Sequence, residues 1–164
     1  MKQKLVDATN IHNKILAYIT NCKEIPEEEL ACKLLHMNYK LLVGLIENHQ
    51  EMKSKVIGHL PEMMNHLSKN IGLIDLLKEM YDNNKNMLYN DAEIQVLIKL
   101  LCENINIQKD TFYKSKLLDF FRFLIYLNGK TLKNNQILIL KNMQDDDYQH
   151  IIFRYSVDII SKLV

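Results

Sequence analysis

The chain has 164 residues and carries 21 basic against 20 acidic side chains, so its formal net charge at pH 7 is +1. The excess of positive charge that is typical of nucleic-acid binding is therefore absent. Apolar residues make up 48% of the sequence, which excludes a disordered chain, and only 4 Gly and 2 Pro disfavour the many tight turns of an all-β fold. The composition favours an all-α protein, and the length predicts a single domain over residues 1–164.

Apolar residues recur at the spacing of amphipathic helices along most of the chain. In chain order, the helices predicted from this spacing cover residues 4–22, 26–47, 47–58, 61–69, 73–81, 85–89, 92–103, 111–127, 133–143 and 148–163. The helix over 111–127 is apolar nearly all round, so we expect it to be the core element, with Phe121 and Leu124 buried. The predicted fold is all-α, with about nine or ten helices.

Start and stop signals mark several of these helices. Pro26 and the three glutamates after it favour a helix start, because proline fits the first helical position and carboxylates favour the positive end of the helix dipole. Pro61 starts a short helix, residues 70–72 break it, and Asp91 is predicted to cap another. Gly129 is expected to end the helix over 111–127, because glycine readily adopts the left-handed conformation found just past a helix C-terminus.

A polar turn recurs three times, each time between an apolar helix and a shorter second helix. The turns contain Asn48, Asn83 and Asn128, which are 35 and 45 residues apart. Periods of about 35–47 residues are typical of stacked armadillo or HEAT helical repeats. We therefore expect an armadillo/HEAT-like solenoid in which Asn48, Asn83, Asn128 and Gly129 are structural turns. A four- or five-helix bundle is the alternative.

Three stretches, in this order along the chain, resemble a known family. They are residues 41–50 (LLVGLIENHQ), residues 73–84 (LIDLLKEMYDNN) followed by Met87-Leu88, and residues 117–136 (LLDFFRFLIYLNGKTLKNNQ). Each is similar to a helix–turn element of the homology (RIH) domain that inositol trisphosphate receptors and ryanodine receptors share. Residues 145–155 further resemble the segment that comes after the second such domain in inositol trisphosphate receptors.

This resemblance implies a function as well as a fold. It implies an armadillo-like segment of a larger, tetrameric calcium-release channel, on the cytosolic side of the endoplasmic reticulum membrane. The implied partners are the other domains and subunits of that channel, and the implied role is to relay ligand-induced conformational change toward the pore. No cofactor is implied, and no ligand-binding residue is carried over, because the pattern looks more like the second RIH domain than the first.

Two other functions remain open. A self-standing armadillo-like adaptor would bind a peptide or helix partner on a concave helical surface. Four methionines either form a soft groove on such a surface or fill the core: Met63, Met64, Met80 and Met87. Direct binding of an inositol phosphate would use Lys130 and Lys133, which lie beside a helix start, where backbone amides attract anions. A solvated helix end explains the same two lysines.

Other candidate sites have simpler explanations. His59, Glu62 and His66 have a spacing that zinc could use, but Pro61 breaks the helix between the first two, so no metal site is expected. The acidic runs at 27–29 and 145–147 suit helix N-termini and lack the glycine and closing glutamate of a calcium-binding loop. No catalytic motif occurs, so we expect no enzymatic activity.

Cysteine usage and hydropathy indicate the compartment. Cys22, Cys32 and Cys102 are odd in number and widely spaced, which indicates buried thiols in a reducing compartment rather than disulfides. No stretch approaches the ~20 apolar residues of a membrane span, and the N-terminus lacks the apolar run of a signal peptide. The segment itself is therefore expected to be soluble, without contact to membrane or nucleic acid.

Overall fold

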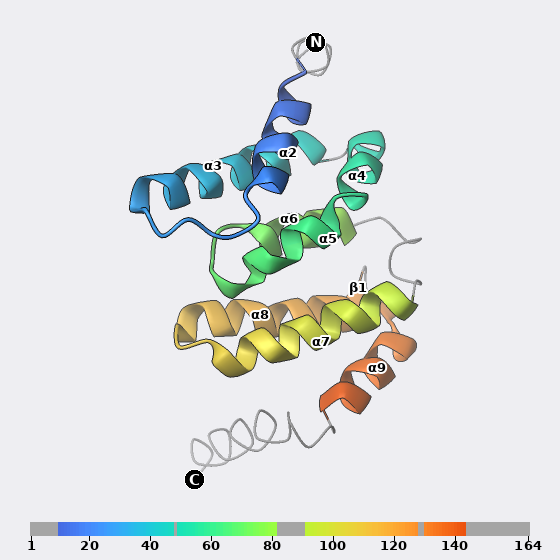
Figure 1. Ribbon diagram of the computed structural model, residues 1–164. Coiled ribbons are helices and arrows are strands. Elements are labelled where there is room, and N and C mark those ends of the chain that lie inside the picture. Colours follow the sequence, from blue (N-terminus) through green and yellow to red (C-terminus); the bar gives the residue numbers. More distant parts are fainter. Residues whose placement is uncertain (1–9, 48, 82–90, 128–129, 144–164) are drawn as a thin grey trace. The chain divides into compact units, whose positions relative to one another are not determined.

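The computed structural model describes residues 10–47, 49–81, 91–127 and 130–143, and in these residues it confirms the all-α fold class (Figure 1). They form eight α-helices, one 3-10 helix and one pair of two-residue strands. The chain divides into two compact units, Met1–Asn84 and Lys85–Val164. The expectation of a single domain over the whole chain stays a prediction.

The first unit is built around one long helix. Its elements are α2 (Ile11–Asn21), α3 (Glu29–Ile46), α4 (Gln50–Ile57), α5 (Leu60–Met63), the 3-10 helix η1 (Met64–Ser68) and α6 (Leu73–Tyr81). Helix α3 packs against three helices: α2, α4 and α6. Figure 1 shows α2 crossing α3, and α2 also contacts α5. Helix α3 is therefore the element against which most of the other helices of the unit pack.

One face of α3 forms the centre of this core. Leu35, Tyr39, Leu42 and Ile46 are all buried, at intervals of four, three and four residues that place them on one side of the helix. Full burial of each such side chain contributes about 1.5–3 kcal/mol, less the conformational entropy that ordering costs. The apolar spacing of this face is what holds α2, α4 and α6 around α3.

The approach of α6 to α3 depends on a glycine. Gly72 has a φ of +104°, a conformation that other residues rarely adopt, and a Cβ atom there would lie 2.8 Å from Cβ of Tyr39. The break expected at residues 70–72 is therefore confirmed. It permits α6 to begin in contact with the middle of α3.

A buried ion pair ties α4 to α6. Nζ of Lys53 lies 2.7 Å from a carboxylate oxygen of Glu79, and the same ammonium donates to the backbone carbonyl of Glu79. The Lys53 side chain is 4% exposed, so its charge is removed from water and needs this partner. A lysine in the core is thus accommodated at the C-terminal end of a neighbouring helix.

The second unit has a helical core of its own. Its elements are α7 (Asp91–Ile107), α8 (Thr111–Ile125), β1 (Tyr126–Leu127), β2 (Lys130–Thr131) and α9 (Lys133–Met143). The three helices contact one another, and the predicted burial of Phe121 and Leu124 in α8 is confirmed. Asn135 of α9 is buried as well and donates to the backbone carbonyl of Leu124 at 2.9 Å, which joins α9 to the last turn of α8.

Some helix ends differ from the prediction. Helix α3 begins at Glu29 rather than at Pro26, and α7 continues to Ile107, past the predicted end at residue 103, because Ile105 is still buried. The predicted loop before α8 contains its cap: the Asp110 carboxylate accepts from the first amides of α8.

Helix α8 ends at Ile125, before the glycine expected to end it. Tyr126 and Leu127 are not helical; they pair antiparallel with Thr131 and Lys130. Backbone pairing between β1 and β2 therefore replaces the last helical turn that was predicted. Asn128 and Gly129 fall between the paired strands, but they lie outside the described residues, as do Asn48 and Asn83. The roles of these four residues as structural turns stay predictions.

Candidate functional site

The most distinctive surface of the first unit is a row of apolar side chains on α3. Leu30, Leu34, Met37 and Leu41 are 72%, 48%, 59% and 55% exposed. Their intervals of four, three and four residues place them on a single helix face. We call these four residues the α3 stripe.

The α3 stripe lies on the opposite side of the helix from the buried face. The two faces share the same spacing, offset along the chain. Helix α3 is therefore apolar on two sides, and only one of them is covered by the part of the unit that the structure describes. Covering an apolar side chain fully contributes about 1.5–3 kcal/mol, so a partner that covers four half-exposed ones gains several kcal/mol. This arrangement suits a docking surface for another helix.

One edge of the α3 stripe carries two lysines. Lys33 and Lys40 each come one residue before a stripe leucine and therefore lie along the same edge. Lys33 is paired with Glu29 at 2.6 Å, and both side chains of that pair are largely exposed. On the other edge, the Asn38 amide donates to the backbone carbonyl of Leu34 at 2.8 Å and so presents no charge. Because Glu29 offsets Lys33, a partner helix with an acidic residue beside Lys40 would match this pattern.

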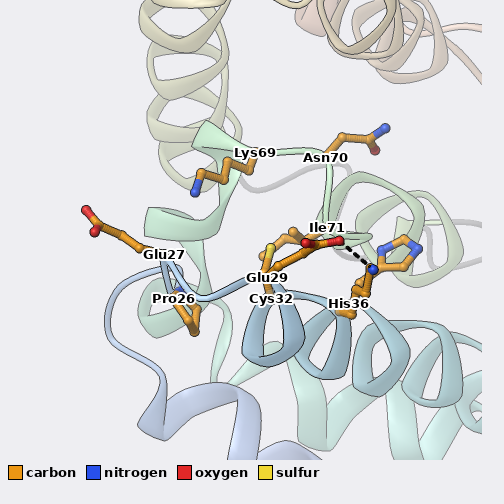
Figure 2. A pocket seen from close by; sticks show the side chains of 9 residues that line it. Pro26, Glu27, Glu29, Cys32, His36, Lys69, Asn70 and Ile71 are labelled. Carbon is orange, nitrogen blue, oxygen red and sulfur yellow. Dashed lines mark hydrogen bonds and ion pairs between the residues drawn. The ribbon is translucent and has the colours of Figure 1, made fainter.

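A pocket of about 380 Å³ lies beside the start of α3. Figure 2 shows Cys32 and His36 on α3 and Lys69 and Ile71 on the segment that leads to α6. Nδ1 of His36 is buried without a hydrogen-bond partner, and Cys32 is a free, half-buried thiol. Lysines and glutamates both line the pocket, so its charge favours no single ligand class.

The structure separates the three residues with zinc-like spacing. His59 is half-buried and interacts with the exposed Glu62 at 3.1 Å, whereas His66 is fully buried. Both ring nitrogens of His66 are in hydrogen bonds, to the Tyr39 hydroxyl and the Cys22 carbonyl. Across the described ranges, no three His, Cys, Asp or Glu side chains are grouped so as to hold a metal ion.

The two lysines predicted to bind an anion are three residues apart in the second unit. Lys130 is in β2, and its side chain is outside the described part of the structure. Lys133 begins α9 and is exposed. Their proposed contact with a phosphate stays a prediction.

Several methionines and one of the three cysteines belong to the core, whereas Cys22 and Cys32 are only half-buried rather than buried as expected. Met63 and Met80 are fully buried, so they fill the core rather than line a groove, while Met64 is half-buried and Met87 lies outside the described residues. Cys102 is fully buried, and burial raises the pKa of its thiol to about 11. It therefore stays protonated and is a poor nucleophile at neutral pH.

Comparison with known proteins identifies a family. A family model described as the RIH domain matches residues 1–152. No curated protein and no solved structure matches the chain. In the described residues, no helix is both long enough and apolar enough to cross a membrane.

Proposed function

The chain belongs to the RIH domain family, and we propose that it is a non-enzymatic scaffold segment of an inositol trisphosphate receptor-like calcium-release channel. The match covers residues 1–152, and RIH domains are the domains that ryanodine and inositol trisphosphate receptors share. We further propose that it corresponds to the second such domain of its receptor. In the channel it would lie on the cytosolic side of the endoplasmic reticulum membrane.

The α3 stripe is the observation that supports a scaffold role. A scaffold segment acts through packed surfaces, and four large apolar side chains on one exposed helix face provide such a surface. The opposite face of α3 is anchored in the core by Leu35, Tyr39 and Leu42, so a displacement at the α3 stripe is carried into α2, α4 and α6. We propose that these helices continue an armadillo-like solenoid that moves as a stiff unit between two states of the channel.

Calcium release from membranes that contain the natural protein tests this function. Leu34→Glu with Leu41→Glu places two charges in the α3 stripe, and both positions are exposed enough to accept them without unfolding the unit. Val96→Glu is the matched control, because Val96 is 60% exposed on α7 and does not belong to the stripe. We expect release evoked by inositol 1,4,5-trisphosphate to fall in the double variant and to be unchanged in the control, at equal amounts of protein. Unchanged release in both would overturn the proposal.

The same stripe also supports the second candidate, a self-standing adaptor. Its spacing and Lys40 on its edge fit an amphipathic helix with an acidic residue beside that lysine. An adaptor would bind such a helix as a soluble protein and would have no effect on calcium release. The two functions are therefore distinguished by where the natural protein is found and by its size.

A further inference from the structure

The last described helix of the second unit has apolar side chains on its exposed side. Helix α9 packs against α7 and α8, with Asn135 and Ile139 buried. Ile137 and Leu140, in contrast, are 50% and 49% exposed. They are three residues apart, so they are neighbours on the surface of the helix. Neighbouring apolar side chains of this size indicate a contact with a further element.

Two lysines lie beside this apolar pair. Lys133 and Lys141 come four residues before and four residues after Ile137, so the three side chains form one row along the helix. Both lysines are exposed, and neither is paired with a carboxylate in the part of the chain that the structure describes. We call Lys133, Ile137, Leu140 and Lys141 the α9 face. A segment that covers the α9 face needs apolar side chains and an acidic one.

The chain itself continues with a segment of this kind. Residues 144–164 follow α9 directly, belong to the same unit and lie outside the described residues. The helix predicted over 148–163 comes after three aspartates, and a fourth, Asp158, lies within it. Apolar residues recur in it at intervals of four, three and four: Tyr148, Ile152, Tyr155 and Ile159. Such spacing gives a helix one apolar face, which needs a partner as much as the α9 face does.

The length of the connection favours contact between the two. Four residues, 144–147, separate the end of α9 from the start of the predicted helix. Connections of about two to five residues are typical of two antiparallel helices that pack side by side. Counted outward from this connection, Lys133 comes opposite Asp158, and Ile137 comes level with the turn over 151–155. The antiparallel arrangement therefore matches opposite charges as well as apolar side chains.

We propose that residues 148–163 form a helix that packs antiparallel on the α9 face of the same chain. In this arrangement, the apolar side of the helix covers Ile137 and Leu140, and Asp158 pairs with Lys133. The segment closes the second unit, so the α9 face is not available to another protein. This inference concerns the second unit alone and does not depend on the channel function.

Amide hydrogen exchange in the full chain tests this packing. An isolated helix of this length is marginal in water, so slow exchange over 148–163 requires packing, and within one chain it is independent of protein concentration. Ile137→Glu places a charge on the α9 face at an exposed position and should speed that exchange by about tenfold. Val96→Glu is the matched control, because Val96 is an exposed apolar residue on α7 of the same unit; it should leave the exchange unchanged.

A charge reversal tests the register of the two helices. Lys133→Glu brings like charges together and should speed exchange over 148–163 by about two- to fivefold, and adding Asp158→Lys should restore the wild-type rate. Four results overturn the proposal. They are fast exchange over 148–163 in the wild type, exchange that slows as protein concentration rises, equal effects of Ile137→Glu and Val96→Glu, and no rescue of Lys133→Glu by Asp158→Lys.

Discussion

Tyr39 donates a hydrogen bond to Nδ1 of His66 across 2.7 Å inside the first unit. The direction is set by the other ring nitrogen, because Nε2 of His66 faces the backbone carbonyl of Cys22, which can only accept. A neutral ring with its proton on Nε2 therefore satisfies both partners. Through this one side chain, η1 is joined to α3 and to the end of α2.

Stability should depend on pH through His66. Burial lowers the pKa of His66 from its ordinary value of 6.5, so the unfolded chain binds this proton more readily than the folded one. The contribution of His66 is then fully present above pH 6.5 and is lost as the pH falls through the lower folded pKa. Urea melts between pH 5 and 8 should show this slope, and His66→Gln should flatten it. An equal slope in the variant would show that other groups cause it.

Removing the partner of Lys53 should destabilise the first unit. Glu79→Ala leaves a buried ammonium without its counter-ion, which costs about 3 kcal/mol at the lower end of values for broken buried pairs. Replacing both residues, as Lys53→Met with Glu79→Leu, should cost less than Glu79→Ala alone. Urea melts of the three proteins measure this. A double variant less stable than the single one would contradict the account.

Gly72 should not tolerate a side chain. Gly72→Ala places a Cβ at a φ of +104° and 2.8 Å from Cβ of Tyr39. The unfavourable backbone conformation alone should lower the free energy of unfolding by about 1–2 kcal/mol, and the steric clash should lower it further. Gly44→Ala is the control, because Gly44 lies inside α3 and a Cβ there meets nothing within 4 Å. That change should stabilise the helix by up to about 1 kcal/mol. Thermal melts that rank the two variants the other way would refute this explanation of the break before α6.

Alanine substitution of two neighbouring leucines on α3 should have very different effects on the free energy of unfolding. Leu35 is fully buried, so Leu35→Ala should lower the free energy of unfolding by about 2–5 kcal/mol. Leu34 is 48% exposed on the α3 stripe, so Leu34→Ala should change it by less than about 1 kcal/mol. Chemical denaturation of the isolated chain compares them directly. Similar losses in both variants would mean that the α3 stripe is covered within the chain.

Helices with clear end signals were predictable from the sequence. The bounds of α6 and α9 agree with the prediction, and the break before α6 was indicated by Gly72. The end of α7 was less clear, because Asn104 is polar and was predicted to lie in a loop, whereas in the structure it lies within α7 and its side-chain amide donates to the backbone carbonyl of Leu100. Local polarity alone does not show that Ile105, one residue later, is buried.

The candidate site was harder to predict, because α3 has two apolar faces with the same spacing. Leu34 and Leu35 are equally apolar in the sequence, and only the positions of α2, α4 and α6 decide which one is buried. The hydrogen bond of His66 to the Cys22 carbonyl was not predictable from local sequence either, because the two residues are 44 positions apart. The two apolar rows in one helix were nevertheless a visible signal that one of them needs a partner.

The size and location of the natural protein test the central claim most directly. An antibody raised against this chain, applied to membrane and soluble cell fractions, measures both. A scaffold segment of a calcium-release channel predicts a membrane-fraction band far larger than the 19.4 kDa of the chain. A soluble band near 19.4 kDa would contradict the channel function and favour the adaptor.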